Sequence, residues 1–217
     1  MFFDELVVRT ETERQDLLDI PLIQDALRGN VTRASYLDFL AQAYHHVRHT
    51  VPLLMTCGSR LPDRLGWLRD AIVAYIDEET GHDEWILSAI DSAGGDASVV
   101  RQSPPSHATE VMLAYAYDSI QRRNPVMFFG MAHVLEGTSV QLASHAADVL
   151  RNALALPANA FTYLTSHGTL DIEHTKVFAG LVNRFDQGGD REAVVHAAKA
   201  FYRLYADVFR GIDRAPT

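Results

Sequence analysis

The sequence predicts an all-α protein, and two observations support this fold class. Apolar residues recur three and four positions apart along segments rich in Leu, Ala, Glu and Arg, which is the spacing of one helix face. No segment alternates apolar and polar residues for long enough to indicate a strand. We therefore expect about seven helices, near residues 13–28, 33–58, 62–93, 106–122, 125–152, 157–186 and 190–211.

Each expected helix ends at residues that stop helices, because Pro lacks a backbone N–H and Gly favours the left-handed conformation that closes a helix. The stops are RGN at 28–30, GGD at 94–96 followed by SPPS at 103–106, NP at 124–125, LP at 156–157 and QGGD at 187–190. Pro52 should kink the helix over 33–58, and the longest break, around 94–105, should be a surface loop that could act as a lid. Because no repeat or linker divides the chain, we expect one domain over residues 1–217.

Composition and charge narrow the classes of function. The hydrophobic share of 47% and the charged share of 22% are typical of a soluble globular protein. The net charge of -9 disfavours nucleic acid or an anionic membrane surface as the main partner, since both need a basic footprint. No apolar window is long enough to cross a bilayer, and the first residues lack the pattern of a signal peptide. Cys57 is the only cysteine, which excludes an internal disulfide, so we expect a cytoplasmic protein that acts on a small molecule.

Three ionisable residues in the stretch YLTSHGTLDIEHTKVF share one helix face. His167, Asp171 and His174 fall within about 60° of one another when each residue turns the helix by about 100°. Phe178 and Leu181 lie on roughly the same side, so the trio should point into the core, where an unpaired Asp is costly. A divalent metal ion would offset that cost, because imidazole nitrogen and carboxylate oxygen bind iron, manganese and zinc. The alternative is a hydrogen-bond network in which Asp171 accepts from either histidine.

A second pair of ionisable residues lies in the helix expected over 62–93. Glu79 falls near the centre of its apolar face, and His82 follows one turn later. This spacing of three is the arrangement that carboxylate-bridged di-metal sites use in helical bundles. Glu78 is displaced toward solvent. For this helix alone, a buried hydrogen bond between Glu79 and His82 is the alternative to metal binding.

A third acidic residue, Glu136, lies in the helix expected over 125–152, which is apolar nearly all round. Glu136 should therefore be buried and need a partner, and His133 one turn earlier is a candidate. Three helices together place acids and histidines on inward faces, and such a set could hold two metal ions bridged by carboxylates. The predicted ligands are Glu79, His82, Glu136, His167, Asp171 and His174.

The other histidines and the large aromatic residues carry weaker signals. His45 and His49 point away from the apolar stripe of their helix, so we expect them at the surface, although His45 or His46 could approach a pocket from a second face. Several aromatic residues should be mostly core, with one or two lining a substrate pocket or lying near an oxidising metal. These residues are Tyr44, Tyr75, Trp85, Tyr202 and Tyr205.

Three quoted segments resemble the heme-oxygenase-like superfamily over nearly the whole chain. They are PLIQDALRGNVTRASYLDFLAQAYHHVRHTVPLL, DEETGHDEW and HGTLDIEH. That superfamily includes thiaminase II, the pyrroloquinoline-quinone biosynthesis protein C group and heme-oxygenase-like diiron oxidases. The resemblance implies one compact helical bundle with a central pocket, frequently as a homodimer.

The closest resemblance is to the diiron branch. Its pattern supplies a Glu and a His from a middle helix, a Glu from a later helix and His-x-x-x-Asp-x-x-His from the next. The stretch from His167 to His174 matches the last element, Glu136 matches the later Glu, and His82 matches the middle His. The sixth ligand is Glu79 if the spacing is Glu-x-x-His, with Glu78 or another acid as the alternative.

This resemblance implies a nonheme diiron oxygenase or oxidase. It implies two iron ions, dioxygen as co-substrate, a small amino-acid-like or fatty-acid-like substrate and room for an external electron donor. Zinc or manganese would suit the same donors. The alternatives are a metal-free enzyme similar to the quinone-biosynthesis group or to thiaminase II, a small-molecule binding module, and a noncatalytic interaction protein. Thiaminase II would need a nucleophilic cysteine in a mid-chain helix, whereas Cys57 lies early.

Overall fold

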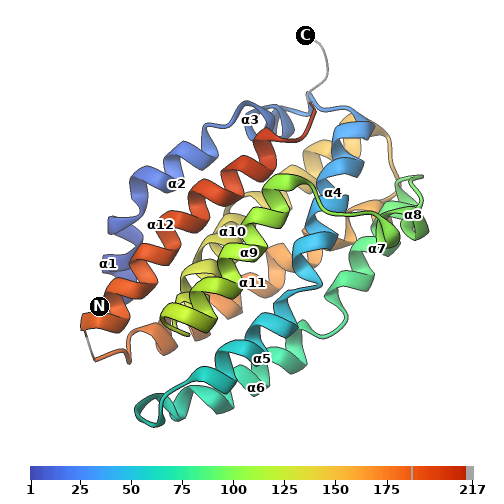
Figure 1. The fold of residues 1–217 in the computed structure, drawn as a ribbon. Helices are drawn as coiled ribbons and strands as arrows, with labels where there is room; N and C mark the ends of the chain where they lie inside the picture. The colour runs from blue at the N-terminus through green and yellow to red at the C-terminus, as the bar shows by residue number, and fades with distance from the viewer. Residues whose placement is uncertain (187, 214–217) are drawn as a thin grey trace.

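The computed structural model describes residues 1–186 and 188–213, and the side chains of residues 141 and 167–174 lie outside the described part. Every regular element in the described part is helical (Figure 1). The α-helices are α1 (Phe2–Arg9), α2 (Glu11–Leu18), α3 (Pro21–Arg28), α4 (Arg33–Val47), α5 (Thr50–Arg60), α6 (Trp67–Glu79), α7 (His82–Ser92), α8 (Ala97–Gln102), α9 (His107–Asp118), α10 (Met127–Leu154), α11 (Thr162–Val182) and α12 (Gly188–Arg210). Three short helical turns join them, namely η1 (Asp63–Leu65), η2 (Ser119–Arg123) and η3 (Ala158–Phe161).

The prediction of an all-α fold is confirmed, but the expected number of about seven helices is wrong. Three of the expected long helices are each two helices. Pro21 begins α3, because it cannot continue the hydrogen bonding of α2. The kink expected at Pro52 is a complete break, since α5 starts at Thr50 and places Pro52 in its first turn, where a missing N–H costs nothing. Gly81 separates α6 from α7 with a φ of 92°, a left-handed conformation that favours glycine.

Two helices lie where none was expected. The first is α1, in the N-terminal stretch before residue 13, and the second is α8, inside the predicted loop 94–105. The side chain of Asp96 accepts hydrogen bonds from the backbone N–H groups of Ser98 and Val99 at 2.9 and 3.1 Å, which caps α8. A strong cap thus supports a helix too short for its apolar period to be read from the sequence.

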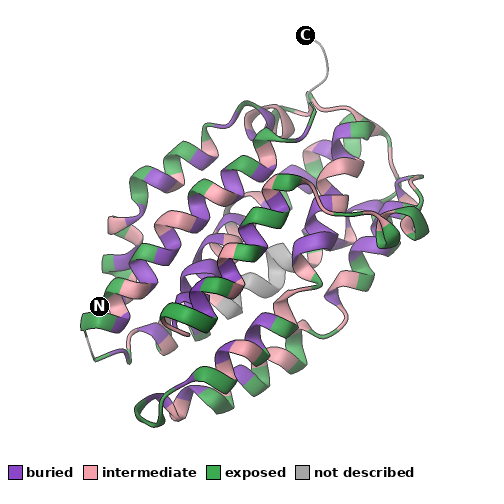
Figure 2. Cartoon of the chain, viewed as in Figure 1, coloured by how far each residue is buried: buried purple, intermediate pink, exposed green. Residues whose placement is uncertain are grey.

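The long helix α10 lies inside the bundle, with α11 and α12 packed along it (Figure 1). Its N-terminal half is apolar on all sides and buried, as for Met127, Phe128 and Phe129. Gly130 permits the close approach of α12, because a Cβ at this position would lie 2.5 Å from the Cβ of Ala197 and 2.7 Å from the backbone oxygen of Val194. Figure 2 shows the same organisation, with buried residues turned toward the middle of the bundle and exposed residues outward.

An ion pair ties α12 to η1, between α5 and α6. The carboxylate of Asp190, which is 2% exposed, accepts hydrogen bonds from both terminal nitrogens of the Arg64 guanidinium and, at 3.0 Å, from the side-chain amide of Asn124. The pairing with Arg64 and the hydrogen bond from Asn124 hold the pKa of Asp190 below its usual value, although burial opposes this. Among the described residues, no helix is long and apolar enough to cross a membrane.

Candidate functional site

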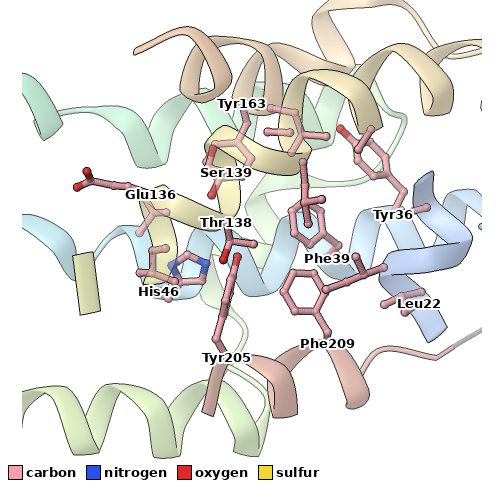
Figure 3. Close-up of a pocket in the computed structure, with 18 of the residues that line it drawn as sticks. Leu22, Tyr36, Phe39, His46, Glu136, Thr138, Ser139, Tyr163, Tyr205 and Phe209 are labelled. Atoms are coloured by element: carbon pink, nitrogen blue, oxygen red, sulfur yellow. The ribbon is translucent and has the colours of Figure 1, made fainter. Parts of the chain in front are cut away.

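A largely apolar cavity of about 170 Å³ lies between α3, α4, α10 and α12. Leu22 of α3, Phe39 of α4 and Phe209 of α12 lie at one end of it (Figure 3). Two carboxylates, Glu79 and Glu136, also line this space, which we call the main cavity. Because apolar walls keep bulk water out, polar groups that face the cavity interact more strongly there than in solvent.

The structure brings two of the predicted ligands together. Nδ1 of His82 lies 3.2 Å from Oε2 of Glu79, and the two side chains are only 4% and 9% exposed. They do not lie on one continuous helix, as the sequence had indicated, because Glu79 ends α6 and His82 begins α7. The turn at Gly81 nevertheless keeps them in contact, and the imidazole of His82 stacks on Trp85 with 4.2 Å between ring centroids. Glu78 is exposed, which fits its predicted displacement toward solvent.

Glu136 is partly buried on α10, less completely than the apolar surroundings of its helix had indicated. It lines the main cavity and also a second cavity of about 160 Å³, which lies among α1, α2, α10, α11 and α12. In Figure 3 its carboxylate points away from the apolar end of the main cavity. Glu79 and Glu136 therefore approach the same space from α6 and α10.

The remaining predicted ligands cannot be placed as side chains. The backbone of His167, Asp171 and His174 forms part of α11, but their side chains lie outside the described residues. Among the side chains that the structure does describe, no group of three or more His, Cys, Asp or Glu residues could hold a metal ion. The described part of the predicted set is thus the pair Glu79 and His82, with Glu136 on a wall of the same cavity.

A small polar group also lies on the wall of the main cavity. It consists of His46, Thr138 and Tyr205, from α4, α10 and α12, and Figure 3 shows these side chains directed toward one another. The rings of His46 and Tyr205 meet edge to face, with 5.8 Å between centroids. The sequence had indicated that His46 could approach a pocket and that an aromatic residue such as Tyr205 could line one. It gave no signal for Thr138, whose hydroxyl also donates to the carbonyl of Val134 at 2.6 Å.

The surface positions expected for His45 and His49 are wrong. His45 is 3% exposed, and its Nε2 lies 3.2 Å from the hydroxyl of Ser103, in the segment after α8 that covers α4. His49 is partly buried, with its Nδ1 2.9 Å from the hydroxyl of Tyr117 on α9. Burial, together with the positive charge of Arg48, lowers the pKa of both imidazoles. Ser103 and helix α9 cover these histidines from a second side, which the single apolar stripe read in the sequence did not indicate.

His133 of α10 lies in the second cavity. Its Nε2 is 3.3 Å from the hydroxyl oxygen of Thr10, and that hydroxyl donates its own proton to the carbonyl of Leu6 at 2.8 Å. Nε2 of His133 is therefore the protonated nitrogen and donates to Thr10. Burial, with a smaller contribution from the positive charge of Arg14, lowers the pKa of His133 to about 4, so the imidazole is neutral near pH 7.

Cys57 has no features of a nucleophile. It is fully buried, its Sγ donates to the carbonyl of Pro125 at 3.2 Å, and burial raises the pKa of the thiol to about 12. A thiolate is the reactive form of cysteine, and this environment disfavours it. Cys57 thus contributes to packing.

Solved structures that are similar to the chain share its fold. A heme-oxygenase-like domain of unknown function from Shewanella denitrificans has a TM-score of 0.88 and 24% identity, covering 97% of this chain and 91% of the other. A TenA homologue from Pseudomonas syringae has a TM-score of 0.79 and 9% identity, over 97% and 91%. A heme oxygenase from the cyanobacterium Synechocystis, solved with heme, has a TM-score of 0.74 and 13% identity, over 98% and 92%.

These likenesses establish the heme-oxygenase-like fold that the sequence had indicated. No curated protein matches the chain. Residues 37–206, which include every predicted ligand, match a family described as iron-containing redox enzymes. Because this match spans most of the sequence, the chain belongs to that family.

Proposed function

We propose that the protein is a nonheme diiron oxygenase or oxidase that uses dioxygen to oxidise a small organic substrate. The observation that carries this proposal is the contact between Glu79 and His82 beside a cavity that Glu136 also lines. The match to a family of iron-containing redox enzymes supports the interpretation of this contact as part of an iron site. A buried carboxylate and imidazole without a cation would form an ordinary hydrogen bond, so the test must separate these two uses of the pair.

The side chains at this site are of the chemical types that bind iron. Carboxylate oxygen and neutral imidazole nitrogen are ligands for nonheme iron, and the described site contains no thiolate that would favour another centre. Glu79, His82 and Glu136 would hold the metal from α6, α7 and α10. His167, Asp171 and His174 of α11 would complete the set in this proposal, two ions being offset by three carboxylates.

Bound iron would supply the activation of dioxygen and the electron transfer, and the chain supplies the rest. Glu79 and His82 are nearly fully buried, so their geometry is fixed by packing before any ion arrives. The apolar walls of the main cavity exclude water and orient an apolar substrate toward the carboxylate side.

Anaerobic titration of the metal-free protein with ferrous iron tests this proposal. We expect about two irons per chain, and an absorbance change on exposure to oxygen that His174→Ala removes. The matched control is His145→Ala, which deletes an exposed imidazole from α10 and should leave both readings unchanged. If the wild-type protein binds no iron under any condition, the diiron function is wrong, and a metal-free pocket on the same fold becomes the better interpretation.

A further inference from the structure

The hydroxyl of Tyr205 is a buried polar group directed into the main cavity. Tyr205 is 7% exposed and lies on the cavity wall, with its hydroxyl end near Thr138 in Figure 3. Within the described part of the chain, this hydroxyl forms no hydrogen bond to another residue. The hydroxyl oxygen is accessible from the cavity and is not enclosed by protein atoms, so its hydrogen-bond partner must come from the cavity. A molecule in the cavity would supply it.

A second tyrosine of the same wall provides an internal comparison. Tyr36 also lines the main cavity, but its hydroxyl donates to the backbone carbonyl of Ala160 at 2.8 Å. Tyr36 is therefore satisfied by the protein, whereas Tyr205 is not. Burial raises the pKa of both phenols well above the usual value, so each remains a neutral O–H group at physiological pH. Tyr205 thus has one proton to donate and lone pairs to accept.

The charge of the cavity restricts what can bind there. Its lining, in the part of the chain that the structure describes, contains no Lys or Arg and two acids, Glu79 and Glu136. In the metal-free protein, an anionic ligand would meet no Lys or Arg among the described lining residues and would be repelled by the two carboxylates. The volume is also limiting, because an engineered cavity of about 150 Å³ holds benzene. A space of about 170 Å³ therefore suits a ligand only slightly larger.

We propose that the main cavity binds a small apolar molecule that carries one uncharged hydrogen-bonding group, and that the hydroxyl of Tyr205 anchors this group beside His46 and Thr138. The apolar remainder of the molecule lies toward Leu22 and Phe209. This inference rests on the proposed function only in naming the ligand as the substrate of the same site, and its charge argument applies to the protein without iron.

Calorimetric titration with three ring compounds of similar size tests the inference. The probes are p-cresol with a hydroxyl, toluene without one, and p-toluate with a carboxylate. We expect p-cresol to bind more tightly than toluene and p-toluate in the chelated protein, which carries no iron. Tyr205→Phe should weaken p-cresol binding by about fivefold, the effect of one hydrogen bond, and leave toluene binding unchanged. Tyr115→Phe is the matched control, because Tyr115 lies on α9 outside the lining of both cavities, and it should leave both affinities unchanged.

Three results would overturn the inference. The first is a p-toluate affinity equal to or higher than that of p-cresol in the chelated protein. The second is equal binding of p-cresol and toluene to the wild type, and the third is an equal loss for both probes in Tyr205→Phe. The first two comparisons need no variant, so a Tyr205→Phe protein that fails to fold does not remove the test. Since the probes bind without iron, failure of the iron titration and failure of this inference are distinguishable.

Discussion

The pH dependence of stability should reveal the burial of His133. Its pKa is lowered from 6.5 to about 4 in the folded protein. Below pH 6.5 the unfolded chain takes up a proton at this imidazole, whereas the folded protein does not until the pH approaches 4. The stabilisation from the neutral imidazole is therefore complete above pH 6.5 and is lost as the pH falls. The interval from pH 6.5 to pH 5 spans about 1.5 pH units, over which the lost stability amounts to about 2 kcal/mol.

Urea denaturation at about pH 7.5 and pH 5 measures this effect. We expect His133→Gln to reduce the change in unfolding free energy between the two pH values by about 2 kcal/mol relative to the wild type. The matched control, His145→Gln, removes an exposed histidine from the same helix and should leave the change as it is. If the wild type and His133→Gln lose the same free energy on acidification, the interpretation of His133 as a buried neutral imidazole is refuted.

Three further substitutions test the packing and the site. Gly130→Ala should lower the unfolding free energy by about 2 kcal/mol, because the new Cβ meets the backbone of α12. Gly180→Ala, where nothing lies within 4 Å, should instead raise it by up to about 1 kcal/mol, and urea denaturation compares the two. Asp190→Ala should cost about 2 to 3 kcal/mol in the same assay, since it leaves the partly buried amide of Asn124 and a half-exposed guanidinium without their carboxylate. Glu79→Gln should reduce the iron stoichiometry in the anaerobic titration while Glu78→Gln does not, and the reverse pattern would make Glu78 the ligand.

The periodicity of the sequence predicted the fold class because an amphipathic helix repeats its signal over many residues. Helix ends are set by single residues, and their effect depends on the surroundings. Pro52 illustrates this point, because the same residue is compatible with a kink in one helix or with the first turn of the next. Gly81 likewise allows a helix to continue at a small cost or to turn in the left-handed conformation, and only the packed structure selects the turn.

The candidate site was partly predictable for a related reason. An acid on an apolar face, such as Glu79, violates the usual pattern and therefore draws attention. Tyr205 and Thr138 fit the usual burial pattern, because both residue types are common on inward faces of helices. A helical wheel indicates that a side chain faces inward but not whether it meets protein atoms or open space. The main cavity arises where helices from both ends of the chain fail to fill the interior, which no local pattern records.

Ala132 and Glu136 lie one turn apart on α10, and both line the main cavity as well as the second one. These two residues of α10 thus form part of the wall between the main cavity, of about 170 Å³, and the second cavity, of about 160 Å³. Shortening Glu136 would remove part of the wall that the main cavity and the second cavity share. A variant that shortens Glu136 would therefore alter both cavities at once. Its effect on ligand binding should be compared with that of a variant at a residue that lines only one cavity.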